Sequence, residues 1–275
     1  MSGSPSSDTH TTASASPIRF DDGAAYERYM GAWSRLAGAT FLDWLAPAGG
    51  LRWLDVGCGN GAFTAMIVER CAPNAVHGID PSPEQLAHAR TRSDVGAAEL
   101  TLGDAMALPF PDDAFDAAVM PLVLFFVPQP AVGVAEMARV VRPGGVVSAY
   151  AWDMPGGGFP YAPAAAVLQE FVADVPGPPS PEASRLDALR ALWQGAGLVD
   201  VETHAITVRR AFDGFDDYWA TVLLGPAFGR LLGAIPAGEV ETFQAALRAR
   251  LPAADEKERI VITATANAVR GRVAA

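Results

Sequence analysis

The sequence has little lysine and little cysteine. Lys257 is the one lysine among 275 residues, and Ala253 stands four positions before it, so a Tyr-x-x-x-Lys pair is absent there. The two cysteines, Cys58 and Cys71, form no Cys-x-x-Cys pattern and belong to no His/Cys group with metal-ligand spacing. We therefore expect no lysine Schiff base, no disulfide framework and no metal site, and we expect a reducing cytoplasm as the compartment.

Basic charge and long hydrophobic runs are also scarce. Acidic residues number 31 and basic residues 20, for a formal net charge of −11. A chain of that charge repels a phosphate backbone, so nucleic acid is not an expected partner. The longest apolar run, residues 117–127, is interrupted by Pro121 and is shorter than the roughly 20 residues that cross a bilayer. The sequence therefore predicts a soluble protein with no membrane partner.

The N-terminal part divides into a tail and a helical segment. Residues 1–16 are rich in Ser, Thr and Ala and lack the basic start and apolar stretch of a secretory signal, so a disordered tail is expected. From Asp22 to Leu45, apolar and aromatic residues recur at helical intervals. We expect capping helices within residues 17–50, and a single domain over residues 17–275.

Short apolar runs alternate with amphipathic segments after residue 51, as in a parallel sheet covered on both faces. Ser82-Pro83-Glu84-Gln85 combines an N-cap serine, proline at the first helical position and a capping-box glutamine, which predicts a helix start. The pattern indicates a doubly wound α/β fold whose cofactor-binding core spans residues 51–153. The expected strands are residues 52–56, 76–80, 99–104, 115–120, 146–152, 198–209 and 260–269.

Two segments interrupt the alternation of strands and helices. Residues 154–181 are rich in Pro, Gly and Ala, and a helix is predicted after them at Ser184–Trp193. Residues 213–250 are helical and aromatic. We interpret 154–181 and 213–250 as helical insertions that cover a substrate.

Polar or conformationally special residues end the first five strands, at Asp55, Asp80, Asp104, Pro121 and Asp153. In an open α/β sheet, ligands bind outside the carboxyl ends of the strands, where the strand order reverses. We therefore expect the site on this rim. Asp153 is the candidate catalytic residue, which would orient or deprotonate a substrate group, and a cap or turn carboxylate is the alternative.

The loop Gly57-Cys58-Gly59-Asn60-Gly61 lets the backbone approach a ligand closely. Gly57, Gly59 and Ala62 also fit the dinucleotide pattern G-x-G-x-x-A, and Asp80 follows about 20 residues later, as expected for an acidic residue on a ribose. Nicotinamide cofactors and S-adenosylmethionine both contain adenosine, so these features suit either one. Three others favour S-adenosylmethionine: a G-x-G-x-G loop after Asp55, Gly-Asp-Ala at 103–105, and a helical segment before the first strand.

Four motifs occur in order along the chain. They are LDVGCGNG at 54–61, GIDPSPEQL at 78–86, GDAMALPFPDDAFD at 103–116 and VRPGG at 141–145. With these motifs, residues 20–152 resemble the class I, Rossmann-like S-adenosylmethionine-dependent methyltransferases, particularly the group of ubiquinone and menaquinone biosynthesis enzymes. That family usually has a seven-stranded, mostly parallel sheet with an antiparallel last strand, which matches the strand count here.

By this resemblance, S-adenosyl-L-methionine is the expected cofactor and its parts map onto the rim. Asp55, Gly57 and Gly59 would hold the methionine end, Asp80 the ribose hydroxyls, Asp104 the adenine amino group, Ala105 the adenine ring, and Pro121 and Leu122 the sulfonium side. The expected cofactor-binding set also includes Cys58, Pro81, Ser82 and Met106.

A helical face before the first strand is a further candidate for the site. Tyr26, Met30 and Trp33 lie at i, i+4 and i+7 and could close over the sulfonium, whose positive charge aromatic rings attract. The alternative is a helix packed on the core.

The sequence and the resemblance together predict a methyltransferase that acts on a small-molecule acceptor. Methyl transfer gains most from positioning and from exclusion of water, so no elaborate catalytic group is expected. Every motif concerns the cofactor, and so the alternative is a regulatory protein that binds S-adenosylmethionine or S-adenosylhomocysteine without transfer. A dehydrogenase is a third, weaker reading.

Overall fold

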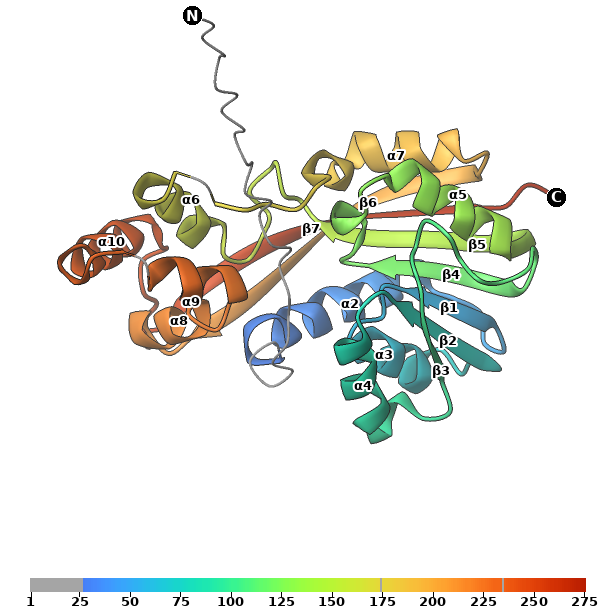
Figure 1. Ribbon diagram of the computed structural model, residues 1–275, viewed down its shortest axis with the longest axis horizontal. Coiled ribbons are helices and arrows are strands. Elements are labelled where there is room, and N and C mark those ends of the chain that lie inside the picture. Colours follow the sequence, from blue (N-terminus) through green and yellow to red (C-terminus); the bar gives the residue numbers. More distant parts are fainter. Residues whose placement is uncertain (1–26, 174, 234) are drawn as a thin grey trace, which may run out of the picture.

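A seven-stranded sheet with helices on both faces forms the centre of the computed structural model (Figure 1). The structure describes residues 27–173, 175–233 and 235–275. The expected tail at residues 1–16 and Tyr26 lie outside the described residues. The sheet confirms the predicted doubly wound α/β fold.

The strand order is β3-β2-β1-β4-β5-β7-β6. Strands β1 to β5 pair in parallel, whereas β7 runs antiparallel to both β5 and β6. The antiparallel strand is thus the last in sequence, as expected. The strands are β1 (Arg52–Val56), β2 (Ala75–Asp80), β3 (Glu99–Leu102), β4 (Phe115–Pro121), β5 (Val141–Trp152), β6 (Val199–Phe212) and β7 (Ile260–Arg272).

The helices fall into two groups. One group covers the sheet, and the other lies beyond the carboxyl ends of β4 and β5 (Figure 1). The first comprises η1 (Glu27–Gly31), α2 (Ala32–Leu45), α3 (Ala62–Arg70), α4 (Pro83–Thr91), η2 (Ser93–Val95), η3 (Leu124–Phe126), α5 (Pro130–Val140), η4 (Pro181–Ser184) and α7 (Leu186–Gly195). The second comprises α6 (Ala162–Phe171), α8 (Phe215–Val222), α9 (Pro226–Leu232) and α10 (Ala237–Arg250).

Neighbouring residues of the inner strands enter two hydrophobic clusters, one on each face of the sheet. In β1, Trp53 packs in the cluster that includes α2 and α3, and Leu54 packs in the cluster that includes α5 and α7. Successive side chains of a strand point to opposite faces. A strand covered on both faces therefore needs a nearly continuous apolar run, which is the pattern that made β1 predictable.

The start of α4 confirms the helix start predicted at Ser82. The Ser82 hydroxyl accepts a 3.2 Å hydrogen bond from the main-chain N–H of Gln85, and Pro83 occupies the first turn. Proline is suited to that position because its missing N–H has no helical partner there.

Several predicted boundaries differ from the structure, among them the end of β3, which is Leu102 rather than Asp104. β5 begins at Val141 because this residue pairs with Phe115 before the register shifts to Ala117 and Val146. α7 begins at Leu186 because residues 181–184 form a separate 3₁₀ turn. β6 and β7 are longer than expected, since their mutual pairing runs from Val199 with Arg272 to Phe212 with Ile260.

The paired strands β6 and β7 extend past the end of β5. The pairing between β5 and β7 ends at Trp152 and Ala266, whereas β7 continues to pair with β6 as far as Ile260. Helices α8, α9 and α10 connect Phe212 to Ile260 at the far end of this extension. The segment predicted at 213–250 is therefore mounted on a two-stranded projection of the sheet (Figure 1).

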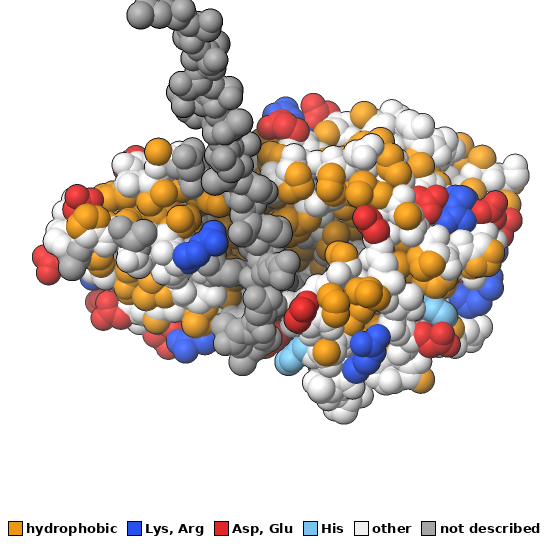
Figure 2. All heavy atoms as spheres, in the orientation of Figure 1, with side chains coloured by type: hydrophobic (Ala, Val, Ile, Leu, Met, Phe, Trp, Pro, Cys, Tyr) orange, Lys and Arg blue, Asp and Glu red, His pale blue; other side chains and the backbone are white. Residues whose placement is uncertain are grey.

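The surface of the described residues carries mixed charge. Figure 2 shows Lys and Arg side chains in separate small groups on this face. Within the described ranges, no helix has the length and apolar character needed to cross a membrane. The expectation that nucleic acid is not a partner stays a prediction.

Candidate functional site

The glycine loop turns sharply out of β1 and is tied to the end of β2. The main-chain N–H groups of Gly57 and Cys58 donate to the carbonyl of Ile79 at 2.8 and 3.1 Å. Gly57 has φ +75°, and a Cβ there would overlap the side chain of Val123. Gly59 has φ +53°, but a Cβ there would meet only the Gln85 amide oxygen, at 3.9 Å, among the described residues. The backbone at Gly59 thus borders open space, as a ligand-facing loop requires.

Asp80 holds this loop in place. One carboxylate oxygen accepts a 2.9 Å hydrogen bond from Gly59 N–H and the other accepts a 2.9 Å hydrogen bond from Ser82 N–H. The side chain is 9% exposed, and burial raises its pKa against the lowering effect of these two N–H groups. Asp80 therefore joins the loop after β1 to the start of α4, with Pro81 between them.

Asp55 lies beneath the loop with no exposed surface. One of its carboxylate oxygens accepts a 2.7 Å hydrogen bond from the Thr64 hydroxyl, and the other has no partner among the described residues. Burial raises the pKa of Asp55 to about 7, the Thr64 hydrogen bond opposes this shift, and Asp80 adds to it. Asp55 thus supports the loop from below, and a contact with the methionine end stays a prediction.

Cys58 packs into the sheet, as its place in a tight loop suggests. A Cβ on Gly78 would lie 2.8 Å from the Cys58 sulfur. Burial raises the pKa of the Cys58 thiol, and the Asp55 and Asp80 carboxylates add to the increase. The thiol is therefore unreactive in this setting.

The loop after β3 begins at Asp104, which is exposed. Its carboxylate accepts a 2.8 Å hydrogen bond from Met106 N–H, and its carbonyl accepts a 3.1 Å bond from Ala107 N–H. Gly103 N–H donates to the Asp80 carbonyl at 3.1 Å, so this loop lies beside the end of β2. The half-buried Ala105 and Met106 share the same turn.

The end of β4 has an unusual backbone. Pro121 is buried, and Leu122 has φ +60°, a left-handed conformation that non-glycine residues rarely adopt. Leu122 N–H donates to the Tyr150 carbonyl at 2.7 Å, which holds this conformation. Strained residues that are held in this way cluster at ligand sites, and Leu122 lies on the rim.

Asp153 follows β5 and closes a turn. Its carboxylate accepts a 3.1 Å hydrogen bond from Gly156 N–H, and its carbonyl accepts a 2.7 Å bond from Gly158 N–H. The side chain is half-buried. This geometry is that of the turn carboxylate named as the alternative, and a contact with substrate stays a prediction.

The helical face that carries Met30 and Trp33 is packed against the end of β5 and the residue that precedes α6. Trp33 has no exposed surface, donates to the Tyr161 hydroxyl at 3.3 Å and meets Trp152 edge-on at 6.4 Å between ring centroids. Met30 is 6% exposed in the same cluster. The alternative of a helix packed on the core fits this arrangement, and a ligand contact from either residue stays a prediction.

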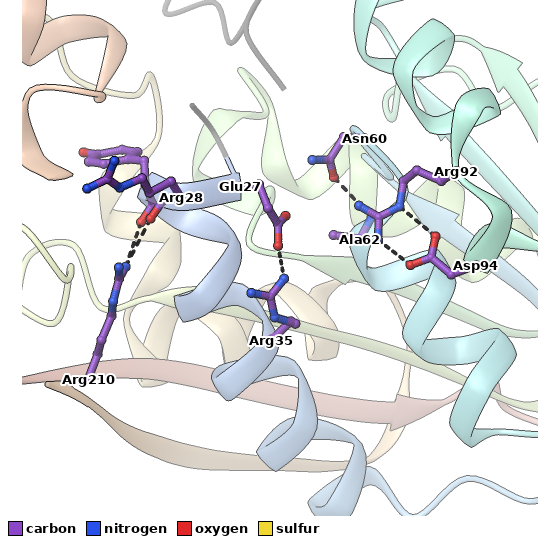
Figure 3. A network of polar contacts seen from close by, with 9 residues as sticks. Glu27, Arg28, Arg35, Asn60, Ala62, Arg92, Asp94 and Arg210 are labelled. Atoms are coloured by element: carbon purple, nitrogen blue, oxygen red, sulfur yellow. Dashed lines mark hydrogen bonds and ion pairs between the residues drawn. The ribbon is translucent and has the colours of Figure 1, made fainter. Parts of the chain in front are cut away.

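Sequence reasoning does not single out three polar residues near the loop. Glu27 and Arg35 form an ion pair across the start of α2 (Figure 3). Asn60 is 4% exposed and its side-chain oxygen accepts a 3.2 Å hydrogen bond from Ala62 N–H, but its amide nitrogen has no partner among the described residues. The one sequence signal is that Asn60 is a polar residue between two glycines.

Comparisons with known proteins match the part of the chain that forms this rim. Residues 54–149 match the model of a family described as a methyltransferase domain. The chain is 43% identical over 96 residues to 2-methyl-6-phytyl-1,4-hydroquinone methyltransferase 2 of Oryza sativa. This match covers 35% of this chain and 28% of that protein. The chain is also 34% identical over 115 residues to the ubiquinone/menaquinone biosynthesis C-methyltransferase of Roseobacter denitrificans. This second match covers 40% of this chain and 46% of that protein.

The likeness to solved structures concerns the fold. Phosphoethanolamine N-methyltransferase 2 of Haemonchus contortus, solved in complex with S-adenosyl-L-methionine, superposes with a TM-score of 0.59 at 17% identity, covering 93% of this chain and 58% of that one. The aligned segments span less than half the length of both curated relatives. Together, the ordered motifs, the sheet topology and these matches support a methyltransferase domain of the class I, S-adenosylmethionine-dependent type over residues 54–149.

Proposed function

We propose that the chain binds S-adenosyl-L-methionine at the rim of β1 to β4 and transfers its methyl group to a small-molecule acceptor. The observation that carries the proposal is Asp80, whose two carboxylate oxygens are each held by a main-chain N–H beside the glycine loop. This carboxylate lies next to the point where the chain returns from β3 to β4, on the other side of β1. Ligands bind at such switch points in open α/β sheets.

The residues of the rim fit the parts of the cofactor. Asp80 would accept hydrogen bonds from the ribose hydroxyls, and the open space at Gly59 would admit a ligand against the backbone. The turn at Asp104 to Met106 would hold the adenine, and Leu122 would border the sulfonium. A carboxylate that accepts from two N–H groups retains lone pairs for further donors, so Asp80 can serve loop and ligand together.

The cofactor supplies a methyl group that its sulfonium already activates. The chain's own residues then have to align the acceptor and exclude water. The cover formed by α6, α8, α9 and α10 lies beyond the carboxyl ends of β4 and β5, where it would do both (Figure 1). Asp153, at the end of β5, would orient a polar group of the acceptor.

The cover favours a planar, apolar acceptor. Its contact with the core is formed by aromatic side chains, among them Tyr161, Phe212 and Tyr218, which pack with centroid distances of 5.1 to 6.0 Å. The two curated relatives are named for a hydroquinone and for ubiquinone and menaquinone. We therefore propose a hydroquinone or a similar aromatic ring as the acceptor. A cytoplasmic location stays a prediction.

One observation favours the alternative of a binding protein without transferase activity. Trp33, Trp152 and Tyr161 are each no more than 1% exposed and fill the space beside the end of β5. An acceptor at that place would have to displace them. Under this alternative, the chain binds S-adenosylmethionine or S-adenosylhomocysteine and no methylated product forms.

Two measurements test the proposal in order. S-adenosylhomocysteine should raise the melting temperature by binding the folded state, whereas NAD should leave it unchanged. Methyl-labelled S-adenosylmethionine is then incubated with a panel of substituted hydroquinones, and products are identified by mass. Equal shifts with the two ligands would contradict the cofactor assignment. Binding without a methylated product across the panel would favour the regulatory alternative.

A further inference from the structure

Strand β6 forms one edge of the sheet. It pairs with β7 from Val199 to Phe212, and within the described ranges no other strand lies beside it. An edge strand presents a row of main-chain N–H and C=O groups that can pair with another chain. Proteins usually shield such a row, and β6 is shielded over its first residues alone.

The hydrogen bonds of Thr265 in β7 show which groups of β6 face outward. Thr265 N–H donates to the Gly158 carbonyl and its carbonyl accepts from Asp153 N–H, both at 3.0 Å, so both groups point toward the segment after β5. Thr207 lies directly opposite Thr265 and therefore forms no hydrogen bond with it. Since the direction alternates along an antiparallel pair, the N–H and C=O groups of Thr207 and of every second residue from 203 to 211 point away from β7.

The start of this outer edge is closed, and the remainder is open. Arg190 of α7 donates to the Val201 carbonyl at 2.9 Å and to the Thr203 hydroxyl at 2.7 Å. Asp200 has φ +52° within a register shift of the β6–β7 pair, and such irregularities also protect edges. From residue 203 to residue 211, the outward main-chain groups bond to no other main-chain group among the described residues.

The charges along β6 indicate what fits this edge. Two acidic residues, Asp200 and Glu202, come before the middle of the strand, and two basic residues, Arg209 and Arg210, come after it. An antiparallel second copy of the strand carries the same charges in reverse order, so its basic end meets the acidic end of the first. A partner strand of one charge sign would be repelled by one half of β6.

We propose that two copies of this chain associate through the outer edges of their β6 strands, antiparallel and about a two-fold axis at Ile206. Residues 203–209 of the two copies then pair with each other, up to the point where Arg190 closes the edge. Glu202 of each copy lies opposite Arg210 of the other, on the same face of the sheet. The Glu202 side chain is 57% exposed, so it can contact this arginine while it keeps its ion pair with Arg270. Both copies use the same surface, as a closed two-fold dimer requires.

The axis at Ile206 lies where the sheet becomes narrow. The pairing between β5 and β7 ends at Trp152 and Ala266, and Ala266 lies opposite Ile206. Beyond this point β6 and β7 form a two-stranded projection, and isolated strand pairs are marginally stable. The second copy supplies a third strand there. The dimer thus supports the part of the sheet that carries α8, α9 and α10, and this inference is independent of the proposed function.

Sedimentation velocity of the full chain over a range of concentrations tests the proposal. The unaltered chain should reach twice the mass of one chain, and added sodium chloride should weaken the dimer because the ion pairs between the copies are exposed. Thr207→Pro removes an N–H that β7 does not use. It should raise the dimer dissociation constant by more than about tenfold, since each copy loses one donor.

Thr207→Val is the matched control, because valine keeps the N–H and suits a strand. This variant should form the dimer with an unchanged dissociation constant. Equal dissociation constants in Thr207→Pro and Thr207→Val overturn the proposal, as does an unaltered chain that stays monomeric at every concentration.

Amide hydrogen exchange, resolved to single residues in the unaltered chain, decides the matter if the proline variant does not fold. The amides of Thr207 and Arg209 should exchange fast in dilute solution and slowly in concentrated solution. Those of Ile206 and Val208 face β7 by the same alternation and should exchange slowly in both. Protection of Thr207 that does not depend on concentration overturns the proposal, because the edge is then covered within a single chain.

Discussion

Gly59 and Asp80, 21 residues apart, are joined by a 2.9 Å hydrogen bond from the main-chain N–H of the first to the carboxylate of the second. This contact links the glycine loop to the acidic end of β2. The loop is thereby held in one geometry, so less conformational entropy is lost when a ligand binds.

Asp80→Ala should weaken S-adenosylhomocysteine binding by about 1.5–3 kcal/mol, the range for hydrogen bonds to a charged group. The variant loses both the acceptor for the ribose hydroxyls and the anchor of the loop. Isothermal titration measures the change, and Asp80→Asn, which keeps the shape, is the control for the charge. An unchanged dissociation constant in both variants would make Asp80 a structural residue only.

Asp55 should make the unfolding free energy depend on pH. Its pKa is about 7 in the folded chain, against the ordinary 3.8. Between these values the unfolded chain releases the proton and the folded chain keeps it, so the contribution of Asp55 to stability falls as the pH rises through this window. Above about pH 7 the contribution is constant, because both states are then ionised.

Asp55→Asn removes this titration. Chemical denaturation at about pH 5 and about pH 8 measures the free energy of unfolding of both proteins. Between these two pH values, the free energy of unfolding of the unaltered chain should fall by up to about 3 kcal/mol more than that of the variant. Other carboxylates also make stability depend on pH, such as Asp94, whose pKa is lowered by Arg92. Their contributions are the same in both proteins and cancel in the comparison. Parallel pH profiles would show that Asp55 is ionised in the folded state.

Two buried tyrosines of the cover should respond in opposite ways to loss of the hydroxyl. Tyr161 accepts a hydrogen bond from Trp33 and donates one of 2.6 Å to the Tyr29 carbonyl. Tyr218 is equally buried, but its hydroxyl has no partner among the described residues. Tyr161→Phe should cost about 1–3 kcal/mol of stability, whereas Tyr218→Phe should be neutral or stabilising by up to about 1 kcal/mol. Urea unfolding measures both, and a large loss in Tyr218→Phe would reveal a partner for its hydroxyl.

Asp153→Asn tests whether this carboxylate positions the acceptor or acts as a base. The Asn side chain keeps an oxygen to accept from Gly156 N–H, so the turn should persist. We expect kcat to fall less than about 100-fold, because general-base catalysis is typically worth 10² to 10⁴-fold and positioning contacts cost less. A larger fall with cofactor binding intact, especially one that is reversed at higher pH, would identify Asp153 as the base.

The inner strands and the start of α4 were predictable because local physics determines them. A strand buried on both faces must be apolar, and the Ser82-Pro83 cap fits a helix start and little else. The extended ends of β6 and β7 were not predictable, since they depend on pairing with each other. A cleft that Arg35 and Ala62 line was not predictable for a similar reason, since these residues follow no shared pattern and lie on one cleft only because α2 packs against α3.

The projection formed by β6 and β7 has a consequence for how this chain can diversify. The segment between Phe212 and Ile260 begins and ends at two residues that pair with each other in the sheet, so its two ends are held side by side. Changes of length or composition in a segment closed in this way cost the rest of a protein little free energy. The 213–259 region can therefore be exchanged as a unit while the rim of β1 to β4 keeps its geometry.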